Sequence, residues 1–90
     1  MSNDMQNDIA FLFETIAKIS SAEDCHAFFD DLCTYKEIDA MAQRLRAAQL
    51  LQNGATYEQI IKQTDISSAT LSRVSKSLKY GKGYKKILGK

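Results

Sequence analysis

The most informative segment of the chain reads TYEQIIKQTDISSATLSRVSKSL, residues 56–78. Thr56 and Ser67 are residue types that favour helix N-caps, and they divide the segment into two short helices. Gln59 stands three residues after Thr56, which completes a capping-box pattern. Four apolar residues occupy positions that two helices joined by a tight turn must bury between them: Ile60, Ile66, Leu71 and Val74. The pattern predicts helices from about Thr56 to Gln63 and from Ser67 to about Lys79.

The turn and the outer side of this segment carry a second pattern. Asp65 stands where glycine is usual in such a turn, and we expect it to adopt the left-handed region, which aspartate tolerates better than most residues. Ile61 stands where a small residue is commoner. The second helix combines short side chains, which permit entry into a DNA major groove, with basic ones suited to phosphates. We expect DNA contacts from Ser67, Ser68, Ala69, Thr70, Ser72, Arg73, Lys76 and Lys79.

Charge is unequally distributed along the chain. Residues 1–33 hold seven acids and one base, whereas residues 34–90 hold eleven bases and four acids. Residues 66–90 contain seven bases and no acid. This asymmetry favours a polyanionic partner for the C-terminal half, and a solvated lysine tail is the simpler alternative. Glu58 is unfavourable near phosphates unless it points away from them.

The remaining sequence predicts further helices. Apolar residues at helical spacing predict a first helix over about 7–19, and Ser21 is the expected N-cap of a second. Thr34 and Glu37 form a capping box for a long third helix that ends at Asn53-Gly54. Residues 84–88 could add a last helical turn. We expect an all-α fold of five to six helices in a single domain, residues 1–90.

The first three helices have broad apolar surfaces, and the apolar residues of the long third helix cover more than one of its sides. Helices of this kind are buried or shared between partners. We therefore expect residues of about 7–53 to form the dimerisation helices of a homodimer. Residues of about 56–79 form the helix-turn-helix, and residues 80–90 form a basic tail.

Other classes of protein find little support. Cys25 and Cys33 would lie roughly 12 Å apart on one helix, too far for a disulfide, and nothing has zinc-ligand spacing. His26 has no nucleophile or acid grouped with it, so we expect no catalytic residue, metal or cofactor. A small helical enzyme of the chorismate mutase type would need a convergent basic pocket, and the long helix offers only Arg44 and Arg46. The opening residues MSNDMQND predict neither a signal peptide nor a membrane span, and we expect a cytoplasmic protein.

Residues of about 21–79 resemble the Trp repressor family, and in particular its Trp-repressor-like YerC/YecD branch of Gram-positive bacteria. The resemblance is carried by SAED (21–24), TYKEIDAMAQRLRAAQLLQNGATYEQI (34–60) and ISSATLSRVSKSLK (66–79). It implies a Trp-repressor-like fold with a C-terminal helix-turn-helix, assembled as an intertwined dimer. It also implies two reading helices about one DNA turn apart on a palindromic operator.

The resemblance further implies a tryptophan pocket, whose positions fall at Thr34, Arg44, Arg73, Val74 and Ser77. In the family a glycine follows the second arginine, whereas this chain has Val74. A branched side chain there is expected to fill the volume of the indole. We therefore expect a vestigial ligand pocket and a regulator that does not depend on tryptophan, with the question of another small-molecule effector left open.

Two functions remain to be compared. The first is a sequence-specific DNA-binding transcriptional regulator, a repressor that acts as a homodimer on double-stranded DNA. The alternative is a dimeric helical interaction module whose basic tail docks on an acidic partner, with no specific DNA binding. The two differ in salt dependence, because DNA binding releases counterions.

Overall fold

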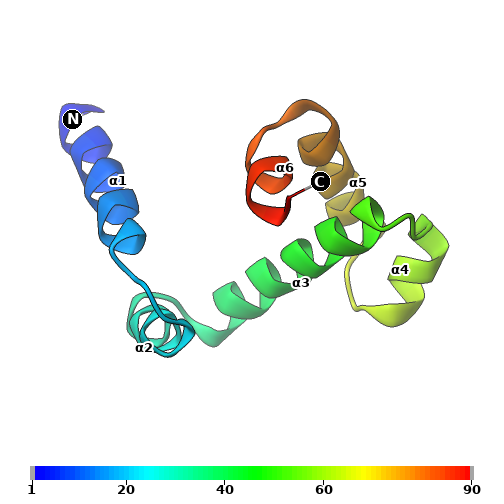
Figure 1. Ribbon diagram of the computed structural model, residues 1–90, viewed down its shortest axis with the longest axis horizontal. Coiled ribbons are helices and arrows are strands. Elements are labelled where there is room, and N and C mark those ends of the chain that lie inside the picture. Colours follow the sequence, from blue (N-terminus) through cyan, green and yellow to red (C-terminus); the bar gives the residue numbers. More distant parts are fainter. Residues whose placement is uncertain (1, 90) are drawn as a thin grey trace. The chain divides into compact units, whose positions relative to one another are not determined.

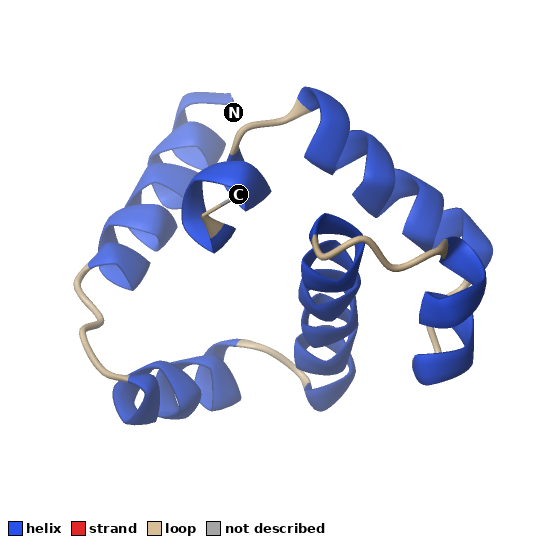
Figure 2. Ribbon diagram, turned by 45° about the vertical axis from the view of Figure 1, so that its right-hand side comes forward, coloured by secondary structure: helices blue, strands red, loops and turns tan. Residues whose placement is uncertain are grey.

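The computed structural model describes residues 2–89, and side chains from residue 4 onward. Six α-helices follow one another along the chain (Figure 1): α1 (Ser2–Ala17), α2 (Ala22–Leu32), α3 (Tyr35–Gln52), α4 (Tyr57–Gln63), α5 (Ser68–Tyr80) and α6 (Gly83–Leu88). Helices and short connections make up all of residues 2–89, which contain no strand (Figure 2). The predicted all-α class is confirmed. No helix within residues 2–89 is long and apolar enough to cross a membrane.

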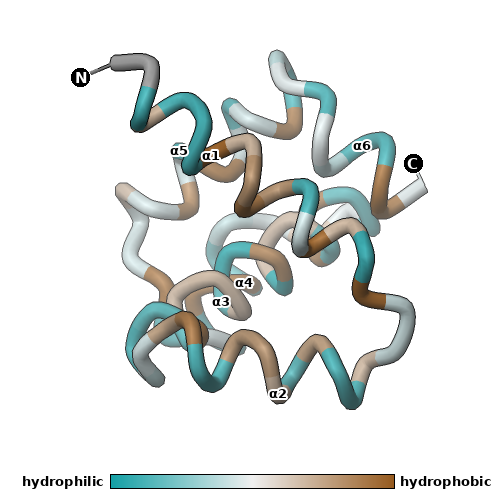
Figure 3. The backbone as a smooth tube through the Cα atoms, turned by 90° about the vertical axis from the view of Figure 1, so that its left-hand side faces the viewer, coloured by the Kyte–Doolittle hydropathy of each residue, from teal (hydrophilic) through white to brown (hydrophobic). Residues whose placement is uncertain are grey.

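The chain forms two compact units, one reaching to Tyr35 and the other starting at Lys36. The first unit contains α1 and α2, along both of which hydrophobic positions recur between hydrophilic ones (Figure 3). Ser21 caps α2 as predicted, since its Oγ accepts a hydrogen bond from the Asp24 backbone N–H at 3.0 Å. Helix α2 therefore begins at a start signal that the sequence contains.

The first helix has different bounds from those that the apolar stripe predicted. It runs over Ser2–Ala17 rather than about 7–19. The polar residues at its start contain no glycine or proline, so nothing prevents the helix from extending to Ser2. At its other end, the backbone N–H groups of Lys18 and Ile19 bond to carbonyls only three residues earlier, which tightens the last turn and ends the helix.

The core of the second unit is built by α3, α4 and α5. Its buried side chains are Ala47, Ala48, Ile60, Ile66, Leu71 and Val74. The four residues predicted to be buried between the two short helices are all in this cluster. The two alanines give α3 a shallow surface, so the branched side chains of α4 and α5 pack directly on it. Tyr84 and Leu88 of α6 pack against the same cluster as partly buried residues.

The connection from α3 to α4 follows the predicted signals. Gly54 has a φ of 93°, the left-handed conformation expected after a helix end. Thr56 then caps α4: its Oγ1 accepts from the Gln59 backbone N–H at 3.2 Å, and Gln59 Oε1 accepts from the Thr56 N–H at 2.9 Å. The predicted capping box is confirmed.

The turn between α4 and α5 differs from the prediction. Asp65 does not adopt the left-handed region, because among residues 2–89 only glycines have positive φ. The turn depends instead on Thr64, whose Oγ1 donates to the Ile60 carbonyl at 2.9 Å and accepts from the Ile66 N–H at 3.3 Å. This one hydroxyl satisfies backbone groups on both sides of the turn, so the chain reverses without a positive φ.

Candidate nucleic-acid interface

The start of α5 is fixed by a pair of hydroxyl groups. Ser67 is the N-cap, and its Oγ accepts from the Thr70 backbone N–H at 3.1 Å and donates to Thr70 Oγ1 at 3.0 Å. Thr70 is half-buried, whereas Ser68 and Ala69 between them are exposed. The hydroxyls of Ser67 and Thr70 thus hold the helix start in place, and the short side chains of Ser68 and Ala69 face solvent.

Helix α5 has two opposite sides. Leu71 and Val74 are buried in the core, and Leu78 packs partly buried against it. At 3.6 residues per turn, Arg73 and Lys76 project from the side away from these residues. Both are exposed, as are Ala69 and Ser72 on the same side. Packing of one side therefore presents the short and basic side chains together.

The electrostatic surroundings of this surface are basic. Lys76 and Lys79 are exposed on α5, which contains no acidic residue. Glu58, the acid expected to oppose phosphates, lies 3.5 Å from Lys62 Nζ in an ion pair whose side chains are both exposed. Such a pair contributes little to stability, but it offsets the local negative charge. Asp65 is the other acid of the α4–α5 region, and it is exposed in the turn.

The sequence pattern did not single out Tyr80, the last residue of α5. Its side chain is 77% exposed, and Lys79 Nζ lies 5.5 Å from the centroid of its ring. The spacing contained a usable signal, because Tyr80 follows Arg73 by seven residues and so lies on the same side of the helix. An aromatic ring thus extends the exposed surface of α5 to its C-terminal end.

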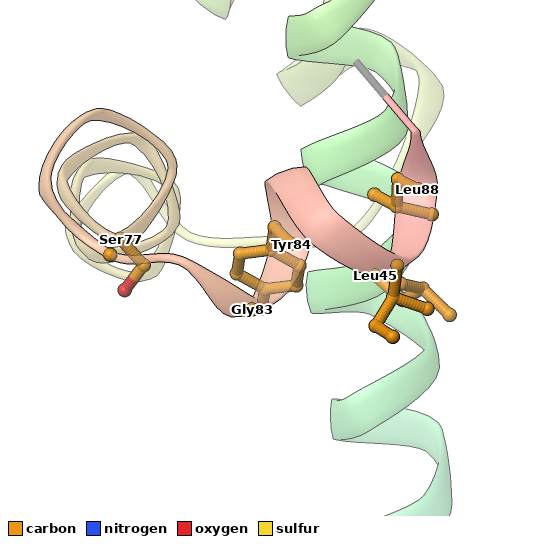
Figure 4. A pocket seen from close by; sticks show the side chains of 7 residues that line it. Leu45, Ser77, Gly83, Tyr84 and Leu88 are labelled. Carbon is orange, nitrogen blue, oxygen red and sulfur yellow. The ribbon is translucent and has the colours of Figure 1, made fainter.

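The residues predicted to form a vestigial ligand pocket differ in burial and belong to different elements. Val74 is buried in the core, Arg44 is half-buried on α3, and Arg73 is exposed. Thr34 precedes α3 in the first unit. Ser77 lines an apolar pocket of about 460 Å³ whose other lining residues are Leu45, Gly81, Gly83, Tyr84, Ile87 and Leu88 (Figure 4). That pocket does not include the two arginines or Val74, and Figure 4 shows Leu45 of α3 beside Leu88 of α6.

The first unit offers no comparable constellation. Cys25 and Cys33 are free and half-buried. His26 Nδ1 lies 2.9 Å from Asp30 Oδ2, one helical turn away on the exposed surface of α2. Within the described residues, no group of three or more His, Cys, Asp and Glu side chains is arranged to hold a metal ion. The α5 surface is therefore the candidate site.

Comparisons with known proteins identify related sequences. The family model "Trp repressor protein" matches residues 7–90. The uncharacterised protein YerC of Bacillus subtilis (strain 168) is 49% identical over 70 residues, which cover 78% of this chain and 67% of that protein.

Two solved structures share the fold. A candidate Trp repressor from Staphylococcus aureus superposes with a TM-score of 0.87 at 40% identity, covering 92% of this chain and 84% of the other. A TrpR-like protein from Eubacterium eligens ATCC 27750 also gives a TM-score of 0.87, at 36% identity, covering 92% of this chain and 87% of the other. The family match over residues 7–90 and the similarity to the Bacillus protein show that this chain belongs to the Trp repressor family.

Proposed function

We propose that this protein is a sequence-specific DNA-binding regulator, a repressor that binds a palindromic operator as a homodimer. The observation that carries the proposal is the division of α5 into a buried side and an exposed side that is basic and free of acids. A helix held in this way by a preceding short helix can place its exposed side in the major groove. Membership of the Trp repressor family supports the same class of function.

Affinity and sequence preference are assigned to different residues of α5. Arg73, Lys76 and Lys79 neutralise phosphates, which supplies affinity for any duplex. Ser68, Ala69 and Ser72 are short and exposed, so they approach base edges and supply sequence preference. Ser67 and Thr70 hydrogen-bond to each other at the start of the helix. Besides contacting DNA, they hold this helix start in position.

The homodimer is supported by apolar side chains that the first unit leaves exposed. Phe11 and Phe13 of α1 are 68% and 62% exposed. Between α1 and α2 lies an apolar pocket of about 440 Å³, lined by Asp8, Phe11, Leu12, Thr15, Phe28 and Leu32. Large exposed apolar surfaces of this kind mark interaction sites. Sedimentation analysis is expected to give twice the mass of one chain, and a monomer at micromolar concentration contradicts the homodimer.

Independence from tryptophan is supported by the packing of Val74. Its side chain is 2% exposed and belongs to the core formed with α3 and α4. A residue that fills space in this way leaves less room beside Arg73 for an indole ring. Isothermal titration calorimetry with L-tryptophan is expected to show no saturable heat, and micromolar binding would refute this part of the proposal.

The DNA-binding proposal is tested by three variants measured on a specific and a random duplex. Lys76→Gln is expected to weaken binding to both duplexes and to lower the salt slope by about 0.9, the contribution of one phosphate contact. Ser72→Ala is expected to change the preferred sequence with little effect on the random duplex. Lys18→Gln is the matched control, because this exposed lysine belongs to the first unit and not to the α4–α5 region. Equal effects of Lys76→Gln and Lys18→Gln would contradict the assignment of α5 as the DNA-contacting helix.

A further inference from the structure

Tyr80 occupies an unusual place for a large aromatic residue. It ends α5 with 77% of its side chain exposed. It follows Arg73 by seven residues and Lys76 by four, so the three side chains project from one side of the helix. That side is opposite the buried Leu71. Tyr80 therefore lies on the DNA-facing side of α5 and contributes nothing to the core.

The surroundings of the Tyr80 ring are cationic. Lys79 Nζ lies 5.5 Å from the ring centroid, within the range of a cation–π contact. Lys85 Nζ donates to the Lys79 carbonyl at 3.3 Å, which adds a positive charge at the end of α5. Lys82, two residues after Tyr80, is also exposed. An exposed phenol near the Lys79 ammonium, in a segment that also contains Lys82 and Lys85, is suited to an anionic partner.

The backbone holds Tyr80 in a defined position. The next residue, Gly81, donates its backbone N–H to the Ser77 carbonyl at 2.8 Å. A Cβ at Gly81 would lie only 2.6 Å from that carbonyl oxygen, so the close approach requires glycine. The last turn of α5 is thus closed directly after Tyr80, and the ring extends from an ordered helix end.

We propose that Tyr80 is a phosphate contact: its phenol hydroxyl donates a hydrogen bond to the DNA backbone at the edge of the major groove, beside the Lys79 ammonium. Tyrosine is one of the side chains that bond phosphate oxygens in protein–DNA complexes. Arg73 and Tyr80 are about 10 Å apart along the helix at about 1.5 Å per residue, close to the ~12 Å width of the major groove. A helix with its first half in the groove therefore carries Tyr80 towards the bounding backbone. This inference rests on the DNA-binding function proposed above.

The test compares Tyr80→Phe, which removes only the hydroxyl, with Tyr35→Phe, a matched change at a tyrosine that is 83% exposed. Fluorescence anisotropy measures the affinity of each variant for the preferred and a random duplex at several salt concentrations. Tyr80→Phe is expected to weaken both complexes about tenfold, the size of one hydrogen bond to a charged group. Its salt slope is expected to equal that of the wild type, because the phenol carries no charge, whereas Lys79→Gln lowers the slope by about 0.9.

Duplexes with single neutral methylphosphonates locate the contact. At one backbone position the substitution is expected to weaken wild-type binding more than binding by Tyr80→Phe, because the variant has only the Lys79 charge to lose at that phosphate. Wild-type affinity of Tyr80→Phe, or a loss confined to the preferred duplex, would overturn the phosphate assignment while the DNA-binding function stands. A wild-type protein that binds no duplex at low salt overturns both the proposed function and this inference.

Discussion

Ile60 and Ile61 are neighbours in α4 that differ sharply in burial. Ile60 is 0% exposed within the core, whereas Ile61 is 42% exposed. Alanine at either position removes the same atoms and makes the same change in helix propensity, so the difference between the variants isolates burial. Ile60→Ala leaves a cavity beside Ala47 and Ala48, which are too small to fill it, and is expected to cost about 2–5 kcal/mol of unfolding free energy. Ile61→Ala is expected to stay within about 1 kcal/mol of the wild type.

Urea and thermal unfolding, followed by far-UV circular dichroism, measure both variants. The protein concentration must be the same throughout, because assembly makes the midpoint depend on it. A loss of about 3 kcal/mol corresponds to a fall in Tm of roughly 12–24 °C for a domain of this size. Equal losses at the two positions, or a larger loss for Ile61→Ala, would refute the assignment of the core.

Substitutions at four further positions test the caps and turns. Thr64→Val removes the hydroxyl that bridges the α4–α5 turn and is expected to cost about 1–2 kcal/mol, because the Ile66 N–H loses its acceptor while the Ile60 carbonyl keeps the Thr64 N–H; an unchanged urea midpoint contradicts this. Ser67→Ala removes the N-cap of α5 at an expected cost of about 1 kcal/mol, whereas Ser67→Asp should melt near the wild-type temperature. Gly81→Ala is expected to destabilise the end of α5, whereas Gly83→Ala, where a Cβ would meet nothing within 4 Å, is expected to be neutral or stabilising by up to about 1 kcal/mol. Thermal melts that rank the two glycine variants in the opposite order would contradict the geometry of this turn.

Features with a local cause could be predicted from the sequence. The N-caps at Ser21, Thr56 and Ser67 depend on residues at most three positions away, and all three are confirmed. Burial of Ile60 and Leu71 follows from helical spacing alone. The glycine conformation at the end of α3 likewise needs no tertiary information.

Features that depend on a choice between local partners were harder to predict. Both Thr64 and Asp65 could shape the α4–α5 turn, and spacing favoured Asp65. The structure uses Thr64, because its hydroxyl bonds both to the Ile60 carbonyl, one helical turn earlier, and to the Ile66 N–H after the turn. Tyr80 was not predicted as a site residue because the expected helix ended at about Lys79, although a spacing of seven residues from Arg73 indicates the exposed side.

The most direct measurement of the central claim is a selection of the wild-type protein on randomised DNA duplexes at low salt, followed by affinity measurements at increasing salt. We expect an enriched palindromic sequence, with an affinity whose logarithm falls linearly and steeply with the logarithm of salt concentration. Failure to enrich any sequence would contradict DNA reading by α5. It would favour instead a dimeric interaction module with a basic docking tail.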